Sequence, residues 1–278
     1  MPDRLYVSGL WHVSENKKRD ASHYQNLLPG TLELLAGSKL IFYTDIVEVR
    51  DQVASLANRQ RIDVEFKDVS IRHLPAWKHS QDAVEACQLM ALDLIPRPSS
   101  FGREKGTIHY WRDLKGSGAD AYRKILAIWL SKVALTTRAA EVAQQESVAW
   151  VDASVSRFNK KRKKWNFTKD AGSSHQVSHF GSNMNFYGDR LPLNASYLEA
   201  HPSTWAQVEK MYSDMSVHAL QMPYGHEEET ILGQCVKAHP QMFRRIDGNL
   251  QPTWRMWRQS ILKKPANTAG TRGRTRTG

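Results

Sequence analysis

Residues 147–154 read Ser-Val-Ala-Trp-Val-Asp-Ala-Ser, a short apolar run that ends in a carboxylate. An unbroken apolar run of this length is typical of a strand that is buried on both faces of a parallel sheet. In open α/β sheets, ligands bind beyond the carboxyl ends of such strands. Asp152 therefore stands where a ligand-binding side chain is expected. The alternative is an aspartate that only caps the turn after the strand.

Three more strands precede this run and alternate with helices. Apolar patterns predict strands over residues 5–11, 39–45 and 62–66, and helical periodicity covers residues 21–36 and 46–60. Strands that alternate with helices in this way form parallel sheets. We therefore expect an α/β, Rossmann-like fold with a mostly parallel central sheet flanked by helices.

The second half of the chain carries weaker strand signals. Helices are predicted over residues 82–94, 120–144, 204–215 and 226–238. The third of these is expected to open at the capping-box spacing of Thr204 and Gln207. Loops are predicted over residues 96–118 and 172–190, which are rich in turn-forming residues. Residues 265–278 have no apolar period, so the basic C-terminal tail is expected to be disordered.

Positive charge is concentrated in two segments of the 278-residue chain, whose net charge is +11. Residues 157–164 contain six basic side chains and residues 263–278 contain five, with no acidic side chain in either segment. The rest of the chain has 28 basic and 28 acidic residues. Local positive charge attracts phosphates or an acidic partner, although many basic loops are only solvated surface.

Composition excludes several classes of protein. Apolar content of 41% and charged content of 24% are ordinary for a globular protein, and no apolar run reaches the length of a membrane span. The N-terminus lacks the pattern of a signal peptide. Cys87 and Cys235 lack metal-like spacing and are interpreted as buried residues in a reduced compartment, so we expect a cytoplasmic protein. No phosphate loop, Gly-x-Ser-x-Gly elbow, helix-turn-helix or zinc finger is present.

Short motifs in a preserved order connect the chain to a known family. They are Ser8-Gly9-Leu10-Trp11, Ile41-Phe42-Tyr43-Thr44-Asp45, Leu130-Ser131-Lys132, Ala149-Trp150-Val151-Asp152-Ala153-Ser154, Glu228-Glu229-Thr230-Ile231-Leu232 and His239-Pro240-Gln241-Met242-Phe243. Spread over most of residues 5–250, they resemble the HtrL/YibB-like family of bacterial glycosyltransferases. The resemblance implies one GT-A-like domain over residues 1–262, with a nucleotide-binding half at about 1–155 and an acceptor half at about 156–262, followed by the basic tail 263–278. It also implies a hexosyltransferase that uses a nucleotide-diphosphate sugar, with UDP as the first nucleotide to consider.

The leaving diphosphate of such a donor needs positive charge. GT-A enzymes commonly supply it as Mn²⁺ or Mg²⁺ on an Asp-x-Asp motif, because hard divalent ions bind carboxylate and phosphate oxygens. The matching tripeptide here is Asp152-Ala153-Ser154, which lacks the second acid. Asp152 is therefore the predicted catalytic residue and metal ligand, or it binds hydroxyls of the donor instead. Candidates for one more metal ligand are His175, His179 and His226, although loop histidines are usually only solvated.

Further residues are predicted to bind the donor. Lys132 interrupts an apolar helix row, so its stem lies along the helix or its ammonium contacts the diphosphate. Gly9 allows backbone to approach the nucleotide, and Trp11 either stacks on the base or belongs to the core. Asp45 ends a strand where the base or ribose is expected. The remaining predicted donor-binding residues are Ser154 and the flap residues Lys160, Lys161 and Arg162.

The acceptor side is expected at the acidic start of the last helix. Glu227, Glu228 and Glu229 are candidates for the carboxylate base that takes the acceptor's proton, and the last two match the family motif. The helix dipole alone also favours acids in a first helical turn. The expected acceptor is a saccharide.

Two alternatives involve nucleic acid. The first is glycosyl transfer to a hydroxymethylated DNA base, with the basic segments contacting phosphates and Phe158 and Trp165 stacking on bases. The second is a non-enzymatic basic protein that binds nucleic acid. It is less supported, because the basic residues lie on appendages and no recognised nucleic-acid motif is present.

Overall fold

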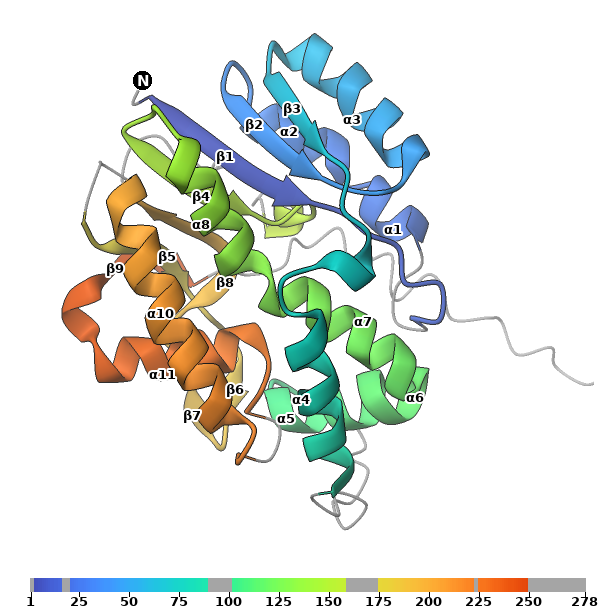
Figure 1. The fold of residues 1–278 in the computed structure, drawn as a ribbon, viewed down its shortest axis with the longest axis vertical. Helices are drawn as coiled ribbons and strands as arrows, with labels where there is room; N and C mark the ends of the chain where they lie inside the picture. The colour runs from blue at the N-terminus through green and yellow to red at the C-terminus, as the bar shows by residue number, and fades with distance from the viewer. Residues whose placement is uncertain (1–2, 17–20, 90–101, 159–174, 223–224, 250–278) are drawn as a thin grey trace, which may run out of the picture.

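A computed structural model describes residues 3–16, 21–89, 102–158, 175–222 and 225–249. Within these ranges, the main sheet has seven strands in the order β3-β2-β1-β4-β8-β5-β9 (Figure 1). Its strands are β1 (Arg4–Gly9), β2 (Lys39–Tyr43), β3 (Asp63–Lys67), β4 (Ser147–Val151), β5 (Val177–Gly181), β8 (Asn194–Ala200) and β9 (Phe243–Asn249). A small hairpin pairs β6 (Asn185–Phe186) with β7 (Asp189–Arg190).

The central sheet is mostly parallel, which confirms the predicted α/β class. The strand pairs β1–β2, β2–β3 and β1–β4 are parallel, whereas β8 runs antiparallel to both β4 and β5. The chain runs outward from β1 to β3 and then returns to the other side of β1 for β4. The β1–β4 pair is therefore the topological switch point of the sheet, the place where open α/β sheets bind ligands.

Helices cover both faces of the sheet. They are α1 (Ala21–Gln25), α2 (Leu28–Leu34), α3 (Val47–Gln60), α4 (Trp77–Leu89), α5 (Lys105–Ile108), α6 (Lys115–Ser117), α7 (Ala119–Leu130), α8 (Lys132–Val142), α10 (Pro202–Ala219) and α11 (Glu228–Ala238). Short 3-10 turns span Ile71–His73, Val155–Phe158 and Pro240–Met242, and a π-helical turn spans His109–Leu114. No helix in the described ranges is long and apolar enough to cross a membrane.

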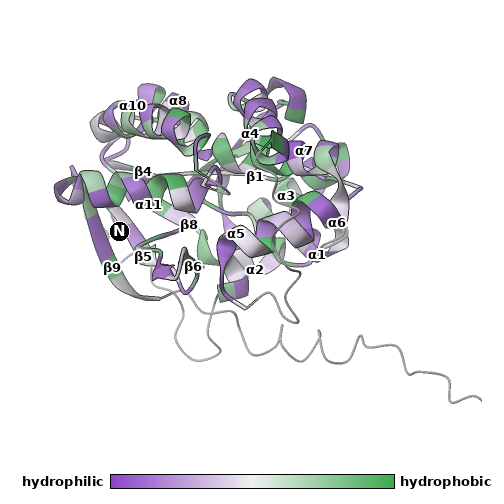
Figure 2. Ribbon diagram, turned by 90° about the horizontal axis from the view of Figure 1, so that it is seen from below, coloured by the Kyte–Doolittle hydropathy of each residue, from purple (hydrophilic) through white to green (hydrophobic). Residues whose placement is uncertain are grey.

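The strands supply two separate cores because their side chains alternate between the two faces. Val7 and Trp150 pack into the core that also contains residues of α7, α8, α10 and α11. Tyr6, Ala149 and Val151 pack into the core that contains residues of α2 and α3. Hydrophobic and hydrophilic residues therefore alternate around the helices, as on α10 and α8 (Figure 2).

The prediction of one long helix over residues 120–144 is wrong. The helix breaks at Ser131, so α7 and α8 are separate elements. The Ser131 hydroxyl donates to the Ala127 carbonyl at 2.7 Å and accepts the Ala76 backbone N–H at 3.1 Å. A serine hydroxyl that bonds back to the carbonyl four residues earlier often bends a helix. The break makes Lys132 the first residue of α8.

Other predicted boundaries also change. The described part of the predicted loop 96–118 contains α5, the π-helical turn and α6, and the predicted helix 21–36 is divided into α1 and α2. The predicted loop 172–190 contains strands in its described part. Helix α10 does not open at Thr204, because Pro202 begins it and the His201 side chain accepts the N–H of Ser203. Cys87 and Cys235 are buried and free, as expected.

Candidate functional site

A pocket of about 310 Å³ opens at the carboxyl ends of β1 and β4, at the switch point of the sheet. Ligand pockets in proteins are typically about 300–1,000 Å³. Nine of the candidate residues named from the sequence line it together: Gly9, Trp11, Lys132, Asp152, Ser154, Phe158, Glu227, Glu228 and Glu229. Segments far apart in the chain therefore meet at the predicted place.

Asp152 follows β4 and reaches the pocket with a side chain that is 15% exposed. Its Oδ1 accepts the Trp150 indole N–H at 2.9 Å, and its Oδ2 accepts the Ser196 hydroxyl at 2.8 Å. The Lys132 ammonium lies 2.9 Å from Oδ1, and the Arg157 guanidinium lies 3.6 Å from Oδ2. These contacts orient the carboxylate toward a ligand site, which favours the site interpretation over a simple turn cap.

Lys132 is held between two carboxylates. Its Nζ lies 2.9 Å from Asp152 Oδ1 and 3.0 Å from Glu228 Oε1, and its side chain is only 6% exposed. Its Nζ also lies 6.0 Å from the centre of the Trp150 ring. The position at the start of α8 directs the lysine into the pocket rather than along the helix flank. We call Lys132, Asp152, Arg157 and Glu228 the pocket cluster.

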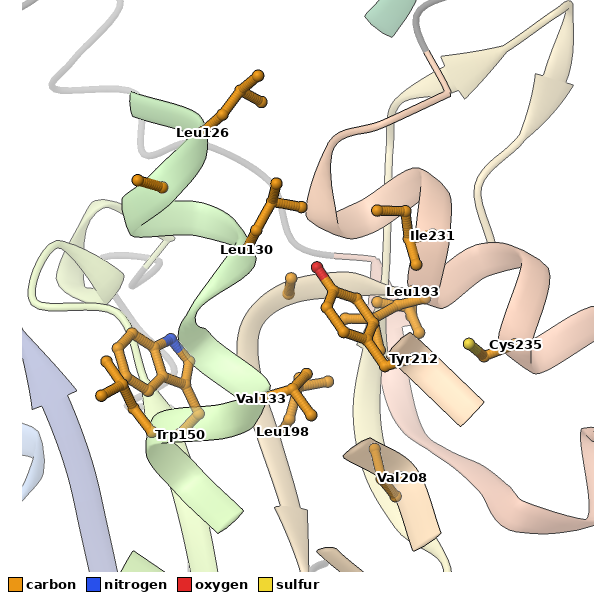
Figure 3. Close-up of a cluster of buried hydrophobic side chains, with 14 of the residues drawn as sticks. Leu126, Leu130, Val133, Trp150, Leu193, Leu198, Val208, Tyr212, Ile231 and Cys235 are labelled. Carbon is orange, nitrogen blue, oxygen red and sulfur yellow. The ribbon is translucent and has the colours of Figure 1, made fainter. Parts of the chain in front are cut away.

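The apolar core fixes the elements that carry this cluster. Leu130 of α7, Val133 of α8, Ile231 of α11 and Trp150 of β4 belong to the same core (Figure 3). Trp150 is 2% exposed, and the indole that donates to Asp152 is part of this packing. Dense packing leaves little freedom for these elements to shift, so the polar groups above the core are preorganised.

Arg157 belongs to the basic segment 157–164 but is turned toward the pocket. Its guanidinium donates to the hydroxyls of Ser154 at 2.6 Å and Ser196 at 3.1 Å. It also lies over the ring of Phe158, which is buried in the core. Phe158 also lines the pocket, and its stacking on nucleic-acid bases stays a prediction. Lys160, Lys161 and Arg162, together with Trp165, lie outside the described residues.

The three acids at the start of α11 have different surroundings. Glu227 caps the helix, with Oε1 accepting the N–H of Thr230. Glu229 accepts the N–H of Ala195 on one oxygen and pairs with Lys105 at 2.8 Å on the other. Glu228 pairs with Lys132 through Oε1, and its Oε2 is buried. The helix dipole alone therefore explains Glu227 better than it explains Glu228.

Sequence reasoning missed a second group of pocket residues. Lys105, His109 and Arg112 line the pocket from the segment predicted as a loop. Asp113 accepts from His109 Nδ1 at 2.7 Å and from Arg112 through both of its oxygens. His109 Nε2 is buried without a hydrogen-bond partner among the described residues and lies 3.7 Å from Glu227 Oε2. The i, i+4 spacing of His109 and Asp113 is the signal that indicates a helical turn here.

Burial and charge shift the pKa values of these groups in opposite directions. Burial alone would raise the pKa of Asp152, but Lys132 and Arg157 outweigh it and hold that pKa at about 2. Burial lowers the pKa of His109 to about 4 despite the adjacent Asp113. Burial, together with the neighbouring Glu228, raises the pKa of Glu227 well above its ordinary value against the effect of Lys105. Near neutral pH, Asp152 is therefore ionised, whereas His109 is neutral.

Gly9 and Trp11 have structural roles beside their position at the pocket. A Cβ at Gly9 would lie 2.6 Å from the Trp11 ring and 2.9 Å from the Tyr43 carbonyl oxygen. Trp11 is 4% exposed and donates its indole N–H to the Val69 carbonyl at 2.7 Å. The ring is thus a wall of the pocket, and its burial favours the core interpretation over stacking on a base.

Other predicted site residues lie away from the pocket. Asp45 is exposed after β2 and is not part of the pocket lining. His175 is exposed, His179 is buried with Nδ1 beside its neighbour's carbonyl, and His226 is buried against Cys87 Sγ at 2.8 Å. None of these histidines lines the pocket.

The polar groups present do not fit a divalent ion. Within the described ranges, no group of three or more histidine, cysteine, aspartate or glutamate side chains is arranged to hold a metal. Hard ions require several oxygen ligands, but both Asp152 oxygens already accept hydrogen bonds from protein groups. The ammonium of Lys132 lies between Asp152 and Glu228, where a shared ion would lie. We therefore derive no chemical step through a metal.

Comparison with known proteins leaves this site without a named counterpart. No protein-family model matches the chain, and no curated protein matches it. The function is therefore inferred from the geometry of the pocket and from the chemistry of its residues.

Proposed function

We propose that the chain is a GT-A-like glycosyltransferase that transfers a sugar from a nucleotide-diphosphate sugar to a saccharide hydroxyl. The observation that carries the proposal is the meeting of Asp152, Lys132 and Glu228 in one pocket at the switch point of the sheet. Ligands of open α/β sheets bind at such points. The motif resemblance to the HtrL/YibB-like family supports the same reaction class.

The reaction needs a diphosphate to leave and a hydroxyl to enter. The bond between the anomeric carbon and the phosphate oxygen breaks, and its electron pair stays on that oxygen. The acceptor oxygen forms the new bond to the anomeric carbon and gives its proton to a carboxylate. We assign this role to Glu228, because it lines the pocket beside Lys132 and Lys132 keeps the carboxylate ionised by lowering its pKa against the effect of burial.

The basic segment 157–164 motivates DNA as a second class of acceptor. Arg157 and Phe158 are its two described members, and both line the pocket. Mass spectrometry of duplex DNA containing hydroxymethylated bases, after incubation with the protein and nucleotide sugars, tests the alternative. Detection of modified bases would show that the acceptor is DNA instead of a saccharide.

The experiment for the proposed function combines ligand binding with a matched pair of variants. Thermal unfolding is recorded with UDP-, GDP-, ADP-, CDP- and dTDP-sugars, and we expect one class to raise the melting temperature. Asp152→Asn should abolish that rise and lower sugar transfer by about 100-fold or more, as expected for the loss of a preorganised charge. Asp45→Asn is the control, since Asp45 also follows a parallel strand but lies outside the pocket.

Two results would contradict the proposal. One is the absence of stabilisation by every nucleotide sugar. The other is an Asp152→Asn protein that transfers sugar as fast as the Asp45→Asn control.

A further inference from the structure

The pocket cluster contains a cation, the Lys132 ammonium, between two carboxylates. Lys132 Nζ lies 2.9 Å from Asp152 Oδ1 and 3.0 Å from Glu228 Oε1. These two carboxylates are far apart in the sequence, yet both meet one ammonium group. Their side chains are 15% and 9% exposed, so the charges face one another with little intervening solvent. Such buried charges interact strongly with one another and with an incoming ligand.

The ammonium retains capacity for a ligand. A lysine has three N–H donors, and the contacts to Asp152 and Glu228 account for two of them among the described residues. Arg157 adds a second cation at 3.6 Å from the other oxygen of Asp152. A diphosphate that enters the pocket therefore meets positive charge that is already fixed in place. Ammonium and guanidinium groups are both effective partners of phosphate oxygens.

We propose that Lys132 supplies the positive charge for the leaving diphosphate, so that this protein binds and uses its donor without a divalent ion. This inference rests on the proposed function. It replaces the sequence-based expectation of Mn²⁺ or Mg²⁺ at Asp152. Asp152 then acts as a positioning residue that holds the ammonium, together with Glu228.

The lysine acts in this step through its charge and its hydrogen bonds. When the carbon–oxygen bond of the donor breaks, the phosphate oxygen gains negative charge, and the ammonium of Lys132 stabilises it. Burial opposes the charged form of Lys132, but Asp152 and Glu228 outweigh it and raise its pKa above the ordinary value. Lys132 therefore keeps its proton, and the proton of the acceptor leaves to Glu228.

The decisive measurement is binding to the wild-type protein with and without metal. Isothermal titration calorimetry is performed with inorganic pyrophosphate and with UDP, GDP, ADP, CDP and dTDP, first in EDTA and then in Mn²⁺. We expect the same ligands to bind in both buffers, with dissociation constants within about threefold of one another, since the fixed charges are the same in both. Binding that requires Mn²⁺ would overturn this inference and leave the proposed function standing. Absence of binding in both buffers would overturn both.

Two variants test the residue assignment. Lys132→Met keeps the length of the side chain and removes its charge, and it should weaken binding in EDTA by about tenfold or more, the effect of one lost charge-assisted hydrogen bond. Lys124→Met is the control, because Lys124 pairs with Asp120 and Glu15 outside the pocket. Equal binding by the two variants would overturn the role of Lys132.

The Lys132→Met variant also exposes the vacated position to a direct probe. Removal of the ammonium leaves Asp152 and Glu228 facing each other without a cation, a pair that favours a divalent ion. We expect Mn²⁺ alone to raise the melting temperature of this variant but not that of the wild-type protein. An equal rise in both would show that the ammonium does not occupy the ion's position. If the variant does not fold, the calorimetry of the wild-type protein decides the inference by itself.

Discussion

Strands β1, β4 and β8 connect two clusters of buried charge, of which one lines the pocket at the switch point and the other does not. The pocket cluster lies where β1 and β4 end and β8 begins. A closed cluster lies at the opposite end, where Glu199 accepts hydrogen bonds from Arg4, Ser147 and Tyr197. Arg4 and Glu199 have side chains that are 3% and 1% exposed, and no residue of the closed cluster lines the pocket at the switch point.

The difference shows that strand direction separates function from stability in this sheet. Both clusters combine carboxylates with cations in the same strands. Open α/β sheets bind ligands beyond the carboxyl ends of their strands, and of the two clusters it is the pocket cluster that lines the pocket there. At the closed cluster, both Glu199 oxygens accept hydrogen bonds, and the network joins the first, fourth and eighth strands to one another. We therefore expect changes in the closed cluster to affect folding, and changes in the pocket cluster to affect ligands.

The largest expected effect on stability comes from Glu199→Gln. The amide keeps the shape of the side chain but leaves the buried Arg4 without a counter-charge, and breaking a buried pair in this way costs about 3–5 kcal/mol. Urea unfolding measures the loss, with the exposed Glu146→Gln variant as a control expected to stay within about 0.5 kcal/mol of the wild type. A loss below about 1 kcal/mol would remove the proposed distinction between the clusters.

Gly9→Ala tests the opposite end of β1. The added Cβ would lie 2.6 Å from the Trp11 ring and 2.9 Å from the Tyr43 carbonyl oxygen, so the wall of the pocket must move. Such overpacking costs about 1–3 kcal/mol, and we expect the tryptophan fluorescence to change with it. Ser8→Ala is the neighbouring control, because the buried Ser8 hydroxyl has no hydrogen-bond partner to lose. Equal stability of the two variants would show that Gly9 is not needed for packing.

Asp152→Asn should have a smaller effect on stability than either change. Lys132 retains its pair with Glu228, and the pocket admits water, so we expect a loss below about 2 kcal/mol. The same urea titration measures it, and donor binding is measured in parallel. A loss as large as that of Glu199→Gln would make Asp152 a structural residue instead.

The smallest expected effect is the change of the free energy of unfolding with pH, which has opposite signs at the two clusters. Lys132 and Arg157 hold the pKa of Asp152 at about 2 against burial, so its ionised form stabilises the fold above about pH 4, and this contribution is lost as the pH falls toward 2. Burial raises the pKa of Glu199 against the effect of Arg4, so its contribution to stability rises as the pH falls.

Urea unfolding at a series of pH values from about 6 to about 3.5 measures this difference. The stability advantage of the wild type over Asp152→Asn should shrink as the pH is lowered, while its advantage over Glu199→Gln should grow. Each change is expected to be below about 1 kcal/mol over this range. Two trends of the same sign would contradict the assigned pKa directions.

Much of this architecture could be predicted from local pattern. The apolar runs that end at Gly9 and Asp152 specify buried parallel strands, and the acidic start of α11 specifies a helix terminus. Local pattern did not predict buried polar groups whose hydrogen-bond partners are distant in the sequence. Strand β8 reads Asn-Ala-Ser-Tyr-Leu-Glu-Ala and has no continuous apolar run that would predict a buried strand. Its Glu199 can be buried because Arg4, from the other end of the sequence, donates a hydrogen bond to it.

What the sequence by itself determined was the kind of strand that precedes Asp152 and the short list of acids and cations around it. Only the tertiary structure decided which of them meet. Asp45 and Asp152 both follow parallel strands, but Asp152 alone lies at the switch point, since strand order depends on pairing between distant segments. Lys132 lies at the pocket, where it meets Asp152 and Glu228 from distant parts of the sequence. Hydrophobic periodicity encodes which side chains are buried, whereas the neighbours of a charge are set by contacts that no local pattern contains.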